Sequence, residues 1–169
     1  MTTYLIASNE MMCRILARRM EGQDLPMPVL WRTPDWLADD TDDEWAASGH
    51  TVDIALVDCS GVDEDPRALL DLVRTRLAPR RWLVLSDALD AGLMFHAARL
   101  GASGCLAVPA PVELVCAAAS LAWAGGQCFP RTALTLLREH NRQADPPPVL
   151  HSSIGSVHAG GPDGSTAMG

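Results

Sequence analysis

The sequence predicts an α/β domain with a doubly wound parallel sheet, and two observations carry this prediction. Five short apolar runs recur along the chain without polar alternation, at 4–7, 28–31, 54–57, 82–85 and 105–108. Continuous apolar runs of this length are typical of parallel strands covered on both faces. Segments with a helical repeat of apolar residues separate the runs. Strands that alternate with helices in this way predict a sheet flanked by helices.

Four helices are expected from the spacing of apolar side chains. The first follows the first strand and carries the stripe Met12, Ile15, Leu16 and Met20. The later stripes are Leu69, Leu72, Val73 and Leu77; Leu93, Ala97 and Leu100; and Val112, Val115, Cys116, Ala119, Ala122 and Trp123. Each stripe gives its helix one apolar face to pack against the sheet.

Region 33–49, where a further helix is expected after the second strand, is dominated by acids. Six of the chain's 21 acidic residues lie between Asp35 and Glu44. The favoured interpretation is a solvated helix face or loop, with a partner-binding site as the alternative. A calcium site is not expected, because 39–44 lacks regularly alternating oxygen ligands around a central glycine.

The pattern divides the chain into three segments. Residues 1–130 are expected to form the folded domain, and 131–143 one additional helix that carries Ala133, Leu134 and Leu137. Residues 144–169 are rich in Pro, Gly, Ser and His. Such a composition buries too little surface to order itself, so this segment is predicted to be a disordered tail.

The composition excludes several classes of function. All 13 basic residues are arginine, so no chemistry that needs a lysine is available, neither a phosphate-loop lysine nor a Schiff base. The formal charge of −8 argues against direct binding of nucleic acid by this chain. The five cysteines form no Cys-x-x-Cys pair, so neither a zinc nor a dithiol redox site is predicted. No apolar run approaches the roughly 20 residues of a membrane span, and a cytoplasmic protein is expected.

Polar residues follow the predicted strands at their carboxyl ends, where an open α/β sheet gathers its ligands. They are Ser8 and Asn9 after the first strand, Asp58 after the third and Ser86 after the fourth, whereas Val108 follows the fifth. Because Asp58 comes after four apolar residues, its carboxylate is expected to be partly desolvated. Ser86 is placed to donate a hydrogen bond to a group carried by Asp58.

Three stretches, 53–58, 83–86 and 98–106, resemble the receiver domain of bacterial response regulators. The continuation 113–130 is similar to the last helix of receivers that precede a LuxR-type DNA-binding domain, the NarL/LuxR subfamily. The resemblance covers about residues 2–130. It implies a CheY-like, flavodoxin-like sheet with the strand order 2-1-3-4-5.

By this resemblance Asp58 is the phosphoryl acceptor, and Ser86 is the hydroxyl that the family keeps after the fourth strand. Ser8 and Asn9 stand where the family has an acidic pair that helps to hold Mg²⁺. Val108 stands where the family has a lysine that contacts the phosphoryl group. Phosphoryl transfer needs a metal ion and cations to neutralise the developing charge. The resemblance therefore predicts a degenerate receiver, or pseudo-receiver.

Two further positions bear on this prediction. Cys105 replaces the aromatic switch residue of the family. Mg²⁺ binding is expected to be weak or absent, unless Glu10 joins Asp58 as a ligand; an exposed first-turn glutamate is the commoner role. Asp58 is then expected to hydrogen-bond loop amides, with residual phosphoryl acceptance as the alternative.

A receiver without phosphorylation chemistry is expected to act through its surface. The family pairs through the helix around 93–100, the strand 105–108 and the helix 112–123, which are rich in apolar residues here. A homodimer through this face is predicted, with a protein partner in a regulatory pathway. The candidate interface residues are Leu93, Met94, Phe95, His96, Ala118 and Leu121.

The predicted function is a phosphorylation-independent response regulator or signalling module, acting in transcriptional regulation. No enzymatic activity is predicted, because Ser86 lacks the nucleophile-elbow glycines that a triad with His96 and Asp58 would need. The alternatives are a weak phosphoacceptor receiver, the N-terminal part of a longer LuxR-type DNA-binding regulator, and a small-molecule site in the vacated pocket.

Overall fold

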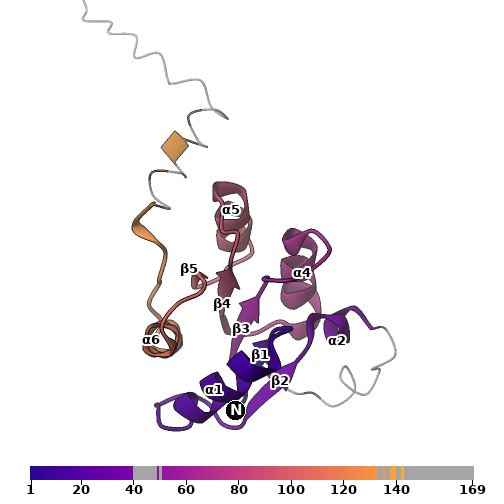
Figure 1. Ribbon diagram of the computed structural model, residues 1–169, viewed down its shortest axis with the longest axis vertical. Helices are drawn as coiled ribbons and strands as arrows, with labels where there is room; N and C mark the ends of the chain where they lie inside the picture. The colour runs from indigo at the N-terminus through magenta and orange to yellow at the C-terminus, as the bar shows by residue number, and fades with distance from the viewer. Residues whose placement is uncertain (40–48, 50, 133–134, 136–137, 140–141, 143–169) are drawn as a thin grey trace, which may run out of the picture.

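Five parallel strands form one sheet in the order β2-β1-β3-β4-β5, which confirms the predicted fold class and strand order. The computed structural model describes residues 1–39, 49, 51–132, 135, 138–139 and 142. The strands are β1 (Thr3–Ile6), β2 (Val29–Arg32), β3 (Ile54–Asp58), β4 (Arg81–Ser86) and β5 (Gly104–Ala107) (Figure 1). No strand end differs from a predicted apolar run by more than one residue.

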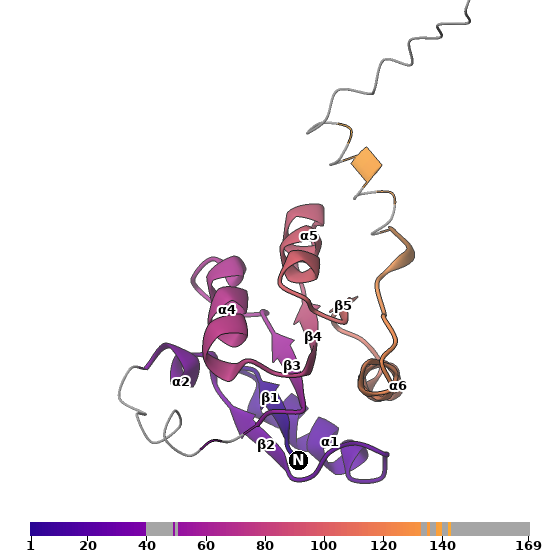
Figure 2. The same cartoon turned by 180° about the vertical axis from the view of Figure 1, so that it is seen from behind.

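Helices cover both faces of the sheet. The elements between and after the strands are α1 (Glu10–Met20), α2 (Pro34–Ala38), α4 (Pro66–Leu72), the π-helical turn η1 (Val73–Leu77), α5 (Ala91–Arg99) and α6 (Val112–Trp123). Helices α1 and α6 lie on one face, and α2, α4 and α5 lie on the other (Figure 2). No helix in the described part of the chain is long and apolar enough to cross a membrane.

Two hydrophobic clusters, one on each face of the sheet, make up the core. In β3, Ala55 and Val57 belong to the cluster under α2, α4 and α5, whereas Ile54 and Leu56 belong to the cluster under α1 and α6. Successive residues of a strand point to opposite faces, so a strand covered on both sides needs apolar residues at every position. This explains the uninterrupted apolar runs.

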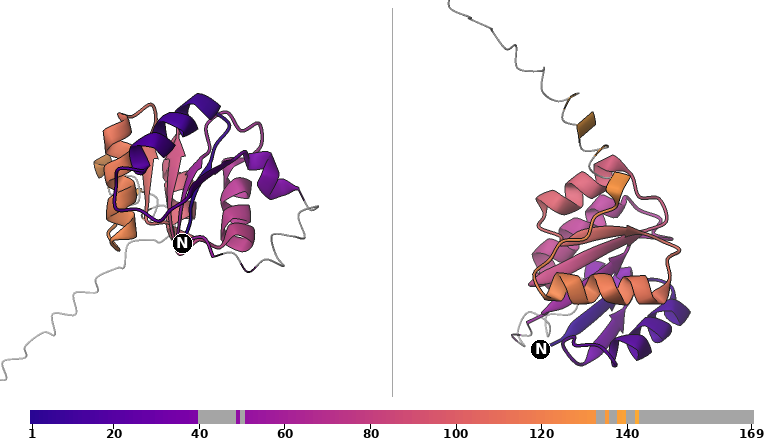
Figure 3. Two further views of the ribbon diagram at one scale, coloured as in Figure 1. Left: turned by 90° about the horizontal axis from the view of Figure 1, so that it is seen from below. Right: turned by 90° about the vertical axis from the view of Figure 1, so that its left-hand side faces the viewer.

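The outer edge of β5 is covered by residues 125–130, called here the edge segment. The chain leaves α6, crosses the open side of β5 and continues toward α5 (Figure 3). The Cys105 amide donates to the Cys128 carbonyl at 2.9 Å, and the Cys128 amide donates to the Ser103 carbonyl at 2.9 Å. Phe129 packs against the cluster that lies under α5. The edge segment therefore satisfies backbone groups that an edge strand otherwise exposes.

Three predictions fall wholly or partly outside the described residues. The acidic region is described only at 33–39 and 49, where α2 accounts for five residues. The additional helix 131–143 is described at only six positions. The segment 144–169, predicted to be a disordered tail, lies outside the described residues altogether.

Candidate functional site

Asp58 and Ser86 lie together at the carboxyl edge of the sheet, on two neighbouring strands. Asp58 ends β3 and pairs in register with Leu85, and Ser86 ends β4. Both side chains are buried, with 5% and 3% of their surface exposed. The structure thus places these two predicted site residues side by side, and it desolvates Asp58 as the apolar run before it predicts.

The hydrogen bonds at this edge hold the loops that follow the strands. The Ser60 amide donates to Asp58 Oδ1 at 2.9 Å, and the Ala88 amide donates to Ser86 Oγ at 3.1 Å. The Asp87 amide donates to Ser60 Oγ at 3.0 Å and joins the two loops. Asp58 therefore has the loop-amide contact expected of a structural carboxylate. Ser60 was not singled out in the sequence, although a hydroxyl two residues after a strand-end aspartate is a recognisable turn signal.

The residues after β1 are engaged in forming α1. Asn9 is the N-cap of the helix, and its Oδ1 accepts a hydrogen bond from the Met12 amide at 3.1 Å. Glu10 forms an ion pair with Arg14 one helical turn later, and both side chains are largely exposed. Glu10 thus has the exposed first-turn role and pairs with Arg14. Among the described residues, no group of three or more His, Cys, Asp or Glu side chains is arranged to hold a metal ion.

Asp58 acts electrostatically on two cysteine thiols. Burial, followed by the negative charge of Asp58, raises the pKa of Cys13 to about 12 and that of Cys59 to about 12. Cys13 comes from α1 and Cys59 directly follows β3, and both are buried. Thiols with such pKa values are neutral at physiological pH, so they supply no counter-charge. The effect of Asp58 on Cys13 could not be predicted from the sequence, because it depends on how α1 packs.

The end of β5 is apolar. Val108 follows the strand, donates its amide to the Ser86 carbonyl at 3.0 Å and packs against the cluster under α1 and α6. Cys105 is fully buried in the opposite cluster, and burial, followed by the neighbouring Cys128, raises its pKa to about 12. Cys105 is therefore a core residue, and Val108 is partly buried against the core. Neither of them provides a charge to the Asp58 edge.

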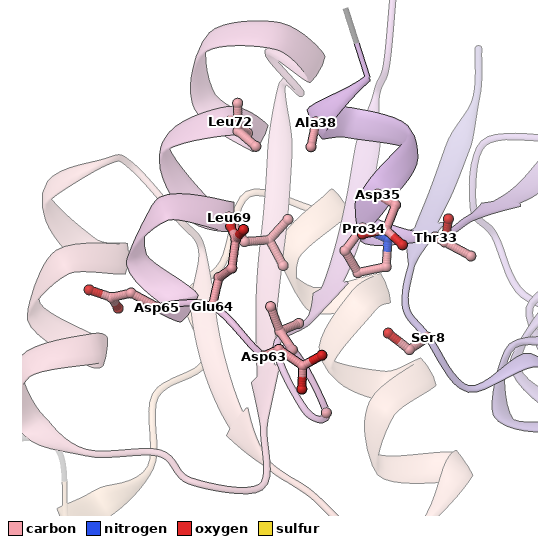
Figure 4. Close-up of a pocket in the computed structure, with 12 residues that line it drawn as sticks. Ser8, Thr33, Pro34, Asp35, Ala38, Asp63, Glu64, Asp65, Leu69 and Leu72 are labelled. Carbon is pink, nitrogen blue, oxygen red and sulfur yellow. The ribbon is translucent and has the colours of Figure 1, made fainter.

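A cavity of about 350 Å³ lies beside this edge, between α2 and α4. Figure 4 shows Ser8, Asp35 and Asp63 around it, from the loop after β1, the first turn of α2 and the loop after β3. Its lining includes Ser8 but not Asn9, Asp58, Ser86 or Val108. Of the five residues predicted to line one vacated pocket, Ser8 alone lines this cavity. The acidic run 63–65 after β3 is the feature of the sequence that could have indicated this cavity.

The predicted interface residues need correction. Leu93, Met94 and Ala118 are buried inside the chain, with only 2–3% of their surface exposed, so they pack in the core instead of forming a contact surface. The edge segment covers the β5 edge between α5 and α6. Of the predicted set, Phe95 and His96 are half-buried and Leu121 is exposed.

The half-buried members make contacts within the chain. His96 Nε2 lies 2.8 Å from Asp71 Oδ1 and links α5 to α4. The guanidinium of Arg99 lies over the ring of Phe95, 5.8 Å from its centre. The His96–Asp71 contact joins α5 to α4, whereas the Arg99–Phe95 contact lies within α5. Leu121 is the exposed member of the predicted set.

The five-stranded 2-1-3-4-5 sheet with an aspartate at the end of its third strand has the CheY-like fold of response regulator receiver domains. A LuxR family DNA-binding response regulator from Silicibacter pomeroyi is similar to this chain at 26% identity, with a TM-score of 0.54 over 78% of this chain and 99% of that one.

Two further solved structures share the fold at lower identity. A LuxR family two-component response regulator from Aurantimonas sp. SI85-9A1 is 15% identical, with a TM-score of 0.57 over 83% of this chain and 96% of that one. The isolated REC domain of RcsB from Salmonella enterica serovar Typhimurium, in the presence of the phosphomimetic BeF3-, is 12% identical, with a TM-score of 0.59 over 81% and 98%. No family model and no curated protein matches the sequence. The structural neighbours support a receiver role in signalling.

Proposed function

We propose that this chain is a pseudo-receiver, a cytoplasmic signalling module that acts through protein contacts independently of phosphorylation. The observation that carries the proposal is the surroundings of Asp58. Ser86 lies on the next strand, the thiols of Cys13 and Cys59 on which the charge of Asp58 acts are neutral, and Val108 follows β5. The neighbours' response regulator fold supports the signalling role.

The electrostatics of phosphoryl transfer explain why such surroundings do not support phosphorylation of Asp58. Charge develops on the transferred group, and pre-organised cations or a metal ion must stabilise it. Removing one such stabiliser typically lowers a rate by about 10²–10³. This chain contains no lysine, and the residues after β1 bring no acidic pair because Ser8 and Asn9 stand there. Asp58 is then retained for its hydrogen bond to the Ser60 amide.

The test is exposure of the full chain to acetyl phosphate, and separately to beryllofluoride, each with and without Mg²⁺. We expect no added phosphoryl group by intact mass and no Mg²⁺-dependent change in tryptophan fluorescence, in the wild type and in Asp58→Asn alike. A Mg²⁺-dependent mass gain that Asp58→Asn abolishes would overturn the proposal and establish the weak phosphoacceptor instead. A response shared by both proteins would indicate modification elsewhere, not acceptance at Asp58.

The output of the module is proposed to be transcriptional regulation. The Silicibacter pomeroyi neighbour is described as a DNA-binding response regulator, and this chain matches 99% of that solved chain. A partner protein or a further part of a longer regulator would then contact DNA, while this chain makes protein contacts, including self-association. This agrees with the formal charge of −8, which opposes binding to a phosphate backbone.

A further inference from the structure

We infer that an acidic peptide segment of a partner protein docks on three arginines at the amino edge of the sheet, called here the arginine patch. The arginine patch consists of Arg74, Arg81 and Arg99, and all three residues are exposed. Asp58 lies at the opposite, carboxyl edge of the sheet. The inference rests on the proposed function, since it names the chemistry of the protein partner through which a phosphorylation-independent module acts.

Two of the arginines lie at the end of α5. Arg74 belongs to η1, and Arg99 is the last residue of α5. A Cβ built at Gly101 would lie 3.9 Å from Arg74 Nη1, so the guanidinium of Arg74 reaches the turn that follows Arg99. The guanidinium of Arg99 lies over the ring of Phe95, 5.8 Å from its centre. Guanidinium groups from two different elements are therefore placed at the end of one helix.

Arg81 lies beside the same turn, at the first position of β4. The Ser103 amide donates to the Trp82 carbonyl at 2.7 Å, which holds the chain after α5 against the start of β4. A Cβ built at Gly125 would lie 3.7 Å from Arg81 Nη2, so this guanidinium reaches the turn after α6. The arginine patch therefore extends along the amino ends of β4 and β5, from η1 to the end of α6.

No acidic side chain of the described residues forms an ion pair with the arginine patch. Asp53, which precedes β3 at the same edge of the sheet, is paired with Arg80 at 3.4 Å. The two acids in the segment 74–99 are Asp87 and Asp90, and both follow β4 at the opposite edge. The positive charge of the arginine patch is therefore not neutralised by carboxylates of the described chain.

The ends of the helices account for only part of this positive charge. Helices α5 and α6 and the turn η1 end at the amino edge of the sheet, and the carbonyl groups at each end carry about −0.5 of a charge. Three arginines carry about twice that total. In addition, Arg81 begins a strand, where no helix end explains a basic residue. A positive surface therefore remains on a chain whose formal charge is −8.

The chemistry of the arginine patch favours a peptide that carries carboxylates. A guanidinium presents parallel N–H groups that match the two oxygens of a carboxylate. Phe95 and Leu100, which are half-buried, lie next to the arginines in α5 and offer apolar contact. A nucleic acid also carries anionic groups, but the formal charge of −8 repels its dense charge at long range. A short acidic segment with an apolar residue fits both features.

The test is binding of the full chain to a fluorescein-labelled synthetic peptide in which glutamates flank a central leucine, measured by fluorescence anisotropy at low salt. We expect saturable binding of this peptide and none of a peptide with glutamine in place of each glutamate. The double variant Arg74→Gln, Arg99→Gln should bind the glutamate peptide roughly tenfold more weakly, because exposed ion pairs contribute modestly and two are lost.

The matched control is the double variant Arg14→Gln, Arg18→Gln. It removes the same charge from two exposed arginines of α1, and we expect it to bind like the wild type. Arg81→Gln is a second variant of the arginine patch that leaves η1 and α5 unchanged, and it should also weaken binding. Because all these residues are exposed, circular dichroism should show unchanged folding.

Three outcomes would overturn the inference: a wild type that does not bind the glutamate peptide, patch variants that bind it like the wild type, or an equal loss in the α1 control. The last outcome would show a response to overall charge. A labelled DNA duplex that binds more tightly than the peptide, and that the patch variants release, would also overturn it and assign the arginine patch to nucleic acid.

These outcomes are separate from the test of the proposed function. Absence of peptide binding would leave the result of the acetyl phosphate and beryllofluoride experiment unchanged, because that experiment reads Asp58 at the other edge of the sheet. Conversely, phosphorylation of Asp58 would overturn the proposed function, and the arginine variants would still decide whether the peptide binds at the arginine patch.

Discussion

At the scale of single residues, the aspartates at the two ends of β3 have different surroundings. Asp53, just before the strand, is buried and accepts a hydrogen bond from the Thr2 amide at 2.8 Å, with Arg80 at 3.4 Å. Asp58, at the other end, accepts from the Ser60 amide, and its charge acts on the buried thiols of Cys13 and Cys59. Asp53 therefore stabilises the amino end of the sheet, and Asp58 stabilises the loop that follows β3 at the carboxyl end.

The buried thiols predict a loss of stability in alkali. The pKa values of Cys13, Cys59 and Cys105 are raised from 9.0 to about 12 in the folded chain. Above about pH 9 the unfolded chain loses these protons and the folded chain keeps them, so stability falls as the pH rises, by about 1.4 kcal/mol per thiol per pH unit until about pH 12. Urea unfolding at about pH 8 and about pH 10 measures the effect. The decline should be smaller in Cys59→Ala, and a stability that is equal at both pH values would contradict the prediction.

At the scale of elements, the edge segment depends on the absence of a side chain at one position of β5. A Cβ built at Gly104 would lie 1.9 Å from the Cys128 carbonyl oxygen. Gly104→Ala should therefore displace the edge segment, break its hydrogen bonds to Cys105 and Ser103 and destabilise the domain by roughly 1–3 kcal/mol. Urea unfolding and hydrogen exchange at the Cys105 and Cys128 amides measure the change.

Gly22→Ala is the control for this substitution. A Cβ at Gly22 meets its nearest neighbour, the Arg19 carbonyl oxygen, at an ordinary 3.7 Å. The Gly22 variant should unfold like the wild type and keep slow exchange at both amides. If Gly104→Ala behaved in the same way, the edge segment would not be held by close backbone contact.

The helices and strands could be predicted from the sequence more accurately than the burial of their individual side chains. The strands were recognisable because each is covered on both faces and is therefore apolar throughout, and Asp58 and Ser86 followed as the residues that end two of them. The burial of Met94 and Ala118 could not be predicted from the sequence. Helical spacing shows which residues share a face, but Met94 is buried because α5 packs beside α4, and Ala118 because α6 packs on the sheet. The ion pair of Glu10 with Arg14 could have been predicted from the sequence, because the two residues stand four apart on one helix.

At the scale of the whole molecule, the uneven charge distribution predicts how association responds to salt. Two copies of a chain with a formal charge of −8 repel each other at long range, which opposes the proposed self-association. Added salt screens the long-range repulsion, with a Debye length that falls from about 30 Å at 0.01 M to about 3 Å at 1 M. Salt also weakens exposed ion pairs such as Arg19–Glu113. The free energy lost in this way is small, because each such pair contributes only about 0–1 kcal/mol. Burial of exposed apolar side chains, such as Leu114 and Leu121, on association is unaffected by charge screening.

Self-association should therefore strengthen as sodium chloride is raised. Sedimentation equilibrium at several salt concentrations measures the dissociation constant, and we expect it to fall as the ionic strength increases. A dimer that weakens with salt would instead require ion pairs to supply most of the affinity. The basic side of α1, at Arg14, Arg18 and Arg19, would then have to meet an acidic surface on the partner copy.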